Sequence, residues 1–272
     1  MRLILLSIFA YIAAAFISFT TARAYPPEIR EDLKYLPSRE VMEFLSLDHR
    51  GFVADYLFVQ VSLHSGGLMW KPLDIQFDSQ WSFGTVDLIT DLDPQYYTAY
   101  LFSGMGLIHN FDDAKLAKPI LQKGMAVFPD SWELPFWIGY DHYTYLEDYQ
   151  TAAQYFYEAA QKPGAPGRFL ALLVSAAKKG GSYENAFWAM KIMMESAEDE
   201  KTRQVYEKKL VQLENLIVLT QASQKFNEIT GHYPESLTDL TRKGLVPGLP
   251  EDPLGMAYTW DSEKKRVVMG KN

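Results

Sequence analysis

The pattern of hydrophobic and polar positions divides the chain into three parts. Residues 3–20 form an uncharged run of 18 residues, preceded by Arg2 and followed by Arg23. Between about residues 80 and 200, small and large side chains recur at a spacing that is typical of paired helices. Over residues 201–229, apolar residues recur at helical spacing, and Gly, Pro and short alternating segments follow. The pattern therefore predicts a membrane-type segment, a helical array and a small α+β tail, in that order.

Two main interpretations fit the first 24 residues. An uncharged run of 18 residues is close to the length that spans a bilayer, whereas the apolar core of a signal peptide usually has about 7–15 residues. Ala22-Arg23-Ala24 has the small-x-small form of a signal-peptidase site, and cleavage there would release a chain that starts at Tyr25. We favour the uncleaved anchor. Both interpretations export the rest of the chain, and a buried helix of a cytosolic protein is a third, less favoured alternative.

A motif of one small residue, a larger residue four positions later and a further residue three positions after that recurs four times. Its first members are Ser82, Ala117, Ala152 and Ala186, which lie 35, 35 and 34 residues apart. The larger members are Val86, Leu121, Phe156 and Met190, and the last members are Ile89, Gly124, Ala159 and Met193. The small residue lets two helix backbones approach, and the larger residue fills the space beside it. The motif therefore predicts an array of three or four helix pairs.

This spacing resembles the tetratricopeptide repeat, a helix–turn–helix unit of 34 residues. The resemblance covers about residues 80–200. Gly139 and the triplet Ala152, Phe156 and Ala159 match the repeat best. Met190 and Met193 depart from it, since the family usually has an aromatic residue and Ala at such positions.

The resemblance also implies where the first helices of the repeats lie. Residues 95–111 and 131–146 are expected to be two of them, and an earlier one is expected over about 49–64. An inserted loop over residues 65–80 would follow that earlier helix. Residues 37–64 further resemble a family of membrane-anchored bacterial repeat proteins whose role is poorly defined.

The end of the chain has a second resemblance. Residues 201–229 are expected to form one long helix that Gly231 ends, followed by a short helix near Ser236 and a hairpin of residues 258–260 with 266–269. This tail resembles the C-terminal part of type II secretion pseudopilins, which share a long helix, a Tyr-Pro step and an Asp-Pro-x-Gly turn before terminal strands. A pilin joins that domain directly to its apolar N-terminal helix. Here a long repeat region intervenes, so the chain is not expected to be a pilin subunit.

The expected fold class is mainly α: a tetratricopeptide-like helical repeat array with a C-terminal helix and a small α+β tail, behind one N-terminal membrane segment. The expected organisation is a membrane anchor or signal peptide over 1–24, leading helices and the inserted loop over 25–79, helical repeats over 80–200, a long helix over 201–230, and the pseudopilin-like tail over 231–272.

Composition excludes several classes of function. The chain has 26 Lys and Arg against 34 Asp and Glu, for a net charge of −8. Nucleic acid is not an expected partner, because binding phosphate requires a basic face that displaces counterions. The absence of Cys excludes disulfides, thiolate catalysis, Fe–S clusters and zinc sites built from Cys.

The sequence offers no motif for catalysis or for a cofactor. No two of the five His residues are spaced i and i+4, so the zinc-hydrolase motif is missing. Asp141 and His142 are adjacent on a predicted helix, where neighbours point about 100° apart, so His142 is expected to be a capped or surface residue. Some pseudopilins hold calcium near the tail turn, but Asp252 and Asp261 are too few for an oxygen cage. We therefore expect a non-enzyme with no catalytic residues, no cofactor and no metal.

Aromatic residues point to a protein-binding surface. Ten of them lie between positions 132 and 157, and in tetratricopeptide repeats the first helices line a concave groove that binds peptides. The candidate groove residues, on a helix starting at Ser131, are Glu133, Phe136, Trp137, Tyr140 and Tyr143. Only one of Phe136 and Trp137 can face the groove, and the alternative is that all the rings merely stack repeat on repeat. Glu133 and Asp141 would favour a partner that carries Lys or Arg.

These expectations favour a non-catalytic scaffold or adaptor that binds proteins at the outer face of the bacterial cytoplasmic membrane. The tail suggests, by resemblance, a pilus-like or secretion assembly. Two alternatives stay open. One is a soluble periplasmic chaperone or binding protein after signal cleavage, and the other is an accessory subunit of a membrane enzyme complex.

Overall fold

The computed structural model describes residues 36–70, 78–108 and 111–270. The predicted anchor or signal peptide therefore lies outside the described residues. No helix in the described ranges is both long enough and apolar enough to cross a membrane. The chain divides into the units Met1–Ser38 and Arg39–Asn272, and the fold below is that of the second unit.

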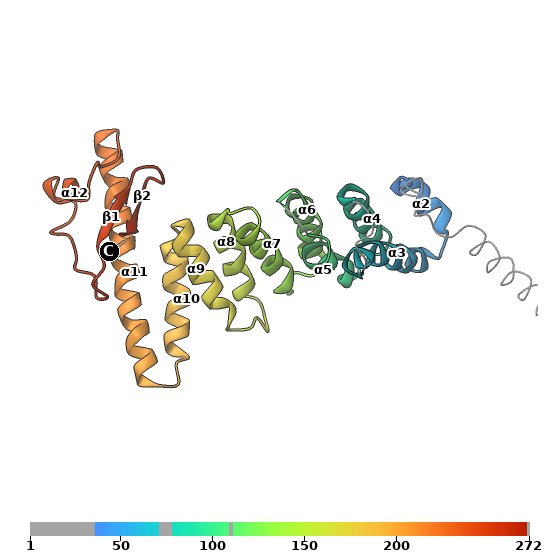
Figure 1. The fold of residues 1–272 in the computed structure, drawn as a ribbon, viewed down its shortest axis with the longest axis horizontal. Coiled ribbons are helices and arrows are strands. Elements are labelled where there is room, and N and C mark those ends of the chain that lie inside the picture. Colours follow the sequence, from blue (N-terminus) through green and yellow to red (C-terminus); the bar gives the residue numbers. More distant parts are fainter. Residues whose placement is uncertain (1–35, 71–77, 109–110, 271–272) are drawn as a thin grey trace, which may run out of the picture. The chain divides into compact units, whose positions relative to one another are not determined.

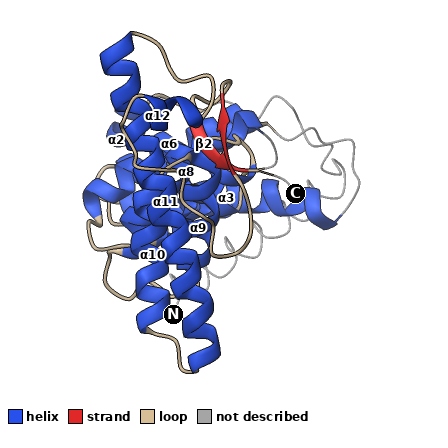
Figure 2. Ribbon diagram, turned by 90° about the vertical axis from the view of Figure 1, so that its left-hand side faces the viewer, coloured by secondary structure: helices blue, strands red, loops and turns tan. Residues whose placement is uncertain are grey.

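The second unit is mainly helical and has one small antiparallel hairpin (Figure 1, Figure 2). In the part of the chain that the structure describes, the helices are α2 (Arg39–Ser46), α3 (Arg50–Trp70), α4 (Ser79–Leu92), α5 (Tyr97–Met105), α6 (Phe111–Val127), α7 (Glu133–Thr144), α8 (Tyr149–Ala160), α9 (Phe169–Gly180), α10 (Tyr183–Glu195), α11 (Glu200–Thr230) and α12 (Thr238–Arg242). The strands are β1 (Tyr258–Asp261) and β2 (Arg266–Met269), with Tyr258 opposite Met269.

The helices pack as successive pairs. α3 packs on α4, α5 on α6, α7 on α8 and α9 on α10, and each pair also contacts the next one (Figure 1). The last pair is followed by α11, which packs along α10. The prediction of a mainly helical fold is confirmed.

The recurring motif marks where the helices cross. Its first members, Ser82, Ala117, Ala152 and Ala186, are all fully buried. A Cβ on Gly139 would lie 2.8 Å from the Phe156 ring and 3.1 Å from the carbonyl oxygen of Ala152. One period earlier, a Cβ on Gly104 would lie 3.0 Å from the side chain of Leu121. The same close approach of a first helix to a second helix therefore recurs 35 residues apart.

Polar contacts between successive pairs repeat the same period. Six of them join residues that are 33 or 34 positions apart: Ser79 with Asp113, Tyr97 with Ser131 (2.7 Å), Lys123 with Thr90 (2.8 Å), Gln122 with Tyr155 (2.8 Å), Lys162 with the Pro129 carbonyl (2.7 Å), and Lys178 with Gln212 (3.2 Å). Each pair is thus bonded to the next at related places, as expected where repeated units contact mainly their neighbours.

The long helix and the tail form one body with the last pairs. α11 begins after Asp199, whose carboxylate accepts from the Thr202 amide at 2.8 Å, and it ends at Gly231, whose φ of 80° is the left-handed helix stop expected from the sequence. Val267 of β2 is fully buried, and Tyr183 of α10 donates a hydrogen bond to its carbonyl. The predicted long helix and hairpin are both confirmed, and the hairpin belongs to the same hydrophobic core as α7 to α11.

Some helix boundaries differ from those expected. The predicted loop does not start at Ser65, because α3 continues to Trp70; Ser65 is buried, and its hydroxyl bonds back to the Val61 carbonyl at 2.9 Å within the helix. α5 ends at Met105 instead of residue 111, where the Gly106 amide donates to the Phe102 carbonyl and closes the last turn.

Ala152→Leu should destabilise the fold by about 1–3 kcal/mol, because Ala152 lies where the backbones of α7 and α8 approach and the added atoms would overpack that crossing. Gln154→Leu is the matched control, since Gln154 is exposed on the same helix. Thermal melts of both variants check this. Equal melting temperatures for Ala152→Leu and the control would contradict the assigned crossing.

Candidate functional site

All five candidate groove residues lie on α7. The helix begins at Glu133, two residues after the predicted start, and no side chain caps it at Trp132. The Ser131 hydroxyl accepts a long hydrogen bond of 3.4 Å from the Leu134 amide. Ser131 therefore sits at the start of the helix, although it caps only weakly.

Phe136 belongs to the core and not to a groove. Its side chain is 8% exposed and stacks on Phe169 of α9, with ring centroids 4.3 Å apart. It also lies 5.6 Å from the ring of Phe156 on α8. Phe136 therefore joins three helices, and of the alternatives Phe136 and Trp137 it is the one that packs in the core.

Trp137 and Tyr140 are half-buried neighbours on another side of α7. Their rings meet edge to face with centroids 5.4 Å apart. The Trp137 Cβ lies over Gly104 of α5. A Cβ added to Gly104 would come within 2.9 Å of the Trp137 Cβ. The backbone of Trp137 is therefore fixed against the preceding pair, while part of each of the two rings stays accessible.

Glu133 is tied to the preceding repeat. Its carboxylate accepts from the Tyr97 hydroxyl at 2.9 Å and from the Ser131 hydroxyl at 3.0 Å. Burial raises the pKa of Tyr97 to about 12, and the hydrogen bond to Glu133 adds to this rise while the bond to Ser131 opposes it. Glu133 thus already has two hydrogen-bond donors within the protein, which leaves it less available to a partner's cation.

Tyr143 bridges two repeats. Its hydroxyl lies 3.0 Å from the Ser175 hydroxyl and accepts from Lys179 at 3.0 Å, both on α9. The Lys179 ammonium also lies 4.5 Å from the centre of the Tyr143 ring and 4.6 Å from that of Tyr149, as in cation–π pairs. The hydrogen bond from Lys179 lowers the pKa of Tyr143.

The structure thus brings three of the five candidates together. Glu133, Trp137 and Tyr140 follow the i, i+4, i+7 spacing of one helix stripe, and all are partly exposed. Phe136 and Tyr143 point to the side of α9, where one packs and the other forms polar bonds. The accessible rings of α7 are therefore Trp137 and Tyr140, with Tyr143 at their edge.

The main feature that sequence reasoning missed is the buried Asp141. It is 2% exposed, and neither of its oxygens has a hydrogen-bond partner within the described residues. Burial raises the pKa of Asp141 to about 8. The expectation that Asp141 attracts a basic partner was wrong, because the side chain faces the interior. Asp141 follows Leu134 by seven residues and Ile138 by three, so it lies on the same buried stripe of α7. That spacing is the signal in the sequence that could have revealed its burial.

His142 is also buried, at 6% exposure, so the expectation of a capped or surface residue was wrong. Its Nδ1 lies 3.3 Å from Oδ2 of Asp148, and its ring stacks near that of Tyr155. Burial lowers the pKa of His142, and nearby Lys118 lowers it further, while Asp148 opposes both. Neither Asp141 nor His142 forms a hydrogen bond with the other.

The tail carboxylates are engaged in separate turns. Asp252 accepts from the amides of Leu254 and Met256, each at 3.0 Å, and also from Gln212 and Tyr258. Asp261 accepts from the Lys264 amide at 2.9 Å. No group of three or more His, Cys, Asp or Glu side chains with metal-site geometry occurs within residues 36–70, 78–108 and 111–270.

No protein-family model matches the chain, and a search of curated proteins finds no match. The two family resemblances therefore stay predictions from the sequence.

Asp141→Asn should flatten the dependence of stability on pH. The folded pKa near 8 lies above the usual 3.8, so between these values the folded chain holds a proton that the unfolded chain has lost. The free energy of unfolding should therefore fall as pH rises from about 4 to about 8, with a slope approaching about 1.4 kcal/mol per pH unit. The neutral Asn variant should lack this loss and be more stable than the natural chain at pH 8.

Denaturant unfolding of both proteins at pH 5, 6.5 and 8 measures the difference. The variant keeps His142, whose lowered pKa makes the free energy of unfolding rise with pH. This contribution appears in both curves and cancels when they are compared. Parallel curves with no divergence above pH 5 would contradict a buried, protonated Asp141.

Proposed function

We propose that the chain is a non-catalytic scaffold that binds proteins at the outer face of the bacterial cytoplasmic membrane. The observation that carries the proposal is the pair of partly exposed rings, Trp137 and Tyr140, on the first helix of a repeat pair. Rings of this kind supply most of the binding energy at protein interfaces. They lie on a helix that packs on α8 and against the core, so the helix that presents them is held on its other side.

The repeat type proposed is the tetratricopeptide repeat. The 34–35-residue period, the helix pairing, and the close helix crossings at Gly104 and Gly139 support it. In that family the first helices line the ligand groove, and here those helices are α5, α7 and α9. The half-buried Trp137 and Tyr140 on α7 and the exposed Met105 on α5 would contribute to such a surface.

The tail is proposed to relate the protein to a pilus-like or secretion assembly. A long helix followed by a two-stranded hairpin agrees with the pseudopilin-like pattern. Its docking against α10 and α11 supports a role as part of the scaffold, since Gln212 of α11 bonds to Asp252 of the tail at 2.9 Å. A soluble periplasmic binding protein and an accessory subunit of a membrane enzyme complex are the alternatives that the experiments below distinguish.

Membrane attachment is tested by fractionation. The full-length chain should stay in the membrane pellet after washes with high salt and with carbonate, because residues 3–20 contain no charge and would be held by the hydrocarbon core. Mass spectrometry of the N-terminus in each fraction gives the result. Recovery of a soluble chain starting at Tyr25 would support cleavage and the periplasmic alternative.

The binding surface is tested by three alanine variants in a pull-down from solubilised membranes. Trp137→Ala keeps the Cβ that packs on Gly104 and removes the ring, so it should weaken partner capture by about 2 kcal/mol with little loss of stability. Tyr140→Ala should act in the same direction. Phe136→Ala is the matched control, since it removes a ring of the core and should destabilise the fold by about 3–5 kcal/mol.

Melting curves recorded beside each pull-down separate binding from folding. If Trp137→Ala and Tyr140→Ala both unfold the protein as Phe136→Ala does, the rings are core residues and the binding surface is elsewhere. Oxidoreductase subunits among the captured proteins would favour the accessory-subunit alternative.

A further inference from the structure

α2 packs against the protein with its polar face. Arg39, Glu43 and Ser46 lie on one side of this helix at i, i+4 and i+7, and Ser46 is buried. The opposite side carries Val41, Phe44 and Leu45, all exposed to solvent, and Phe44 is 76% exposed. An amphipathic helix of a globular protein normally turns its apolar stripe toward the core. In α2 this arrangement is reversed.

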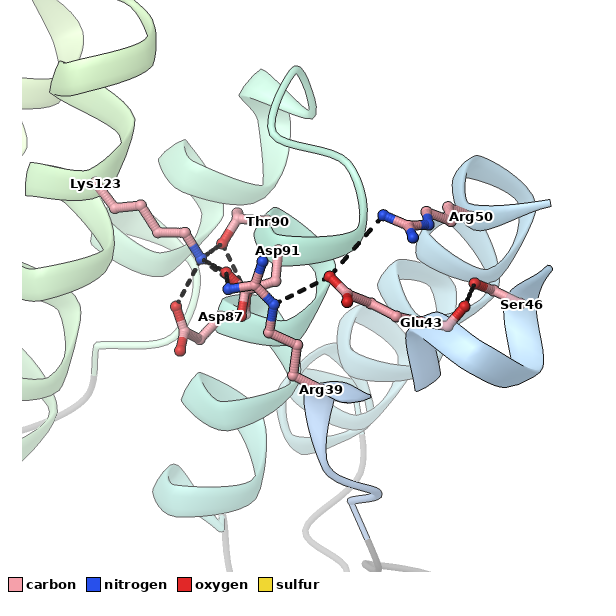
Figure 3. Close-up of polar contacts among 8 residues, drawn as sticks. All are labelled: Arg39, Glu43, Ser46, Arg50, Asp87, Thr90, Asp91 and Lys123. Carbon is pink, nitrogen blue, oxygen red and sulfur yellow. Dashed lines mark hydrogen bonds and ion pairs between the residues drawn. The ribbon is translucent and has the colours of Figure 1, made fainter. Parts of the chain in front are cut away.

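A polar network holds α2 in this orientation (Figure 3). Arg39 lies 3.4 Å from Asp91 of α4 and also bonds to Glu43 at 3.0 Å. Lys123 of α6 reaches the same Asp91 at 2.5 Å and Asp87 at 3.0 Å. The polar side of α2 is thus connected through α4 to α6. These contacts orient α2 so that its apolar side faces solvent.

α3 is apolar on two opposite faces. One face packs on α4 and is buried, through Ala54, Leu57 and Val61. The other face is exposed and consists of Phe52, Tyr56, Val59 and Leu63, at the i, i+4, i+7, i+11 spacing of a helix stripe. The exposed Asp55 and Gln60 lie between the two faces, and a helix of a globular protein normally has only one apolar stripe, which faces the core. Here only one of the two faces has a protein neighbour among the described residues.

These two helices concentrate exposed apolar side chains. Sixteen large hydrophobic residues are exposed in the described part of the chain, and eight of them fall within residues 41–63: Val41, Phe44, Leu45, Leu47, Phe52, Tyr56, Val59 and Leu63. We call these eight residues the α2–α3 apolar surface. Half of the exposed large hydrophobic residues thus fall within residues 41–63, and concentrated apolar exposure marks contact surfaces.

We propose that the α2–α3 apolar surface lies in the interfacial layer of a lipid bilayer. This inference rests on the membrane attachment proposed above. The proposed anchor over residues 3–20 is separated from α2 by residues 21–38. A stretch of 18 residues spans at most about 60–65 Å. A bilayer that holds residues 3–20 would therefore lie within reach of this surface and offer it an apolar phase.

The chemistry of the surface agrees with lipid as the occupant. It consists of Phe, Tyr, Leu and Val, which are the side chains that interfacial helices bury about 5–10 Å into the headgroup boundary. The exposed Asp48 and Asp55 lie in the same stretch of chain, and the chain as a whole carries −8. The contact should therefore be apolar and should not require anionic lipid. A dimer formed through the α2–α3 apolar surface would rest on eight large apolar side chains from each copy, whereas stable interfaces usually involve about 20–30 residues a side.

The natural chain contains no Cys, which allows single labels to be placed on the intact protein. Val41→Cys and Val59→Cys report on the proposed surface, and Val218→Cys on α11 is the control. All three valines are exposed to a similar extent, at 45%, 54% and 48%. Each full-length variant carries a polarity-sensitive fluorophore and is reconstituted into phosphatidylcholine vesicles, with and without nitroxide-labelled lipid.

Nitroxide lipid should reduce the emission of labels at positions 41 and 59 by about twofold or more, with a blue shift, whereas the label at position 218 should be unaffected. Flotation of the vesicles reports attachment separately. If the chain floats but all three labels stay in water, the attachment holds and this inference fails. If the chain does not float, the proposed attachment itself fails. A blue shift without lipid, together with oxidative cross-linking between chains of the unlabelled Val59→Cys variant, would overturn lipid in favour of a second copy.

Discussion

The array depends on the close approach of helix backbones at each crossing. Gly139 of α7 meets the ring of Phe156 on α8, and one period earlier Gly104 of α5 meets Leu121 of α6. A side chain at either glycine would collide with these atoms at about 3 Å, so the spacing of the helices follows from the missing Cβ. The crossing recurs 35 residues apart in these two pairs, which therefore offer their neighbours equivalent surfaces, whereas Val174 stands at the next position of the series. The inter-repeat bonds at separations of 33 or 34 residues follow from that equivalence.

An array built in this way exposes an apolar face at the first and at the last pair, and such faces must be covered. After the last pair, α11 and the tail provide the cover, through the buried Val267 and the bond between Gln212 and Asp252. Before the first pair, α2 does the opposite, since it turns its polar face to Asp91 and leaves its apolar face outside. This difference between the two ends is the physical basis of the proposal that the first end contacts a bilayer.

The rings of α7 show how one helix packs into the core on one side and leaves rings partly accessible on another. Successive residues on a helix point about 100° apart, so Phe136 enters the core against Phe169 while Trp137 stays partly accessible. Asp141 lies on the same stripe of α7 as Leu134 and Ile138. The packing that buries these two residues therefore also buries a carboxyl group that has no hydrogen-bond partner among the described residues. That carboxyl stays protonated near neutral pH because the interior disfavours its charge.

The sequence by itself determined the features that depend on local pattern. These are the 34–35-residue period, the long helix ending at Gly231 and the hairpin near the C-terminus, because helical spacing, a left-handed stop and strand alternation are properties of short segments. Tertiary structure decided which of Phe136 and Trp137 is buried, that Asp141 and His142 lie inside, and that α2 turns its polar face inward. Each of these depends on a neighbour from another element, such as Phe169 or Asp91. A periodic pattern shows that a helix has two faces, but only the packing partners decide which face meets the protein.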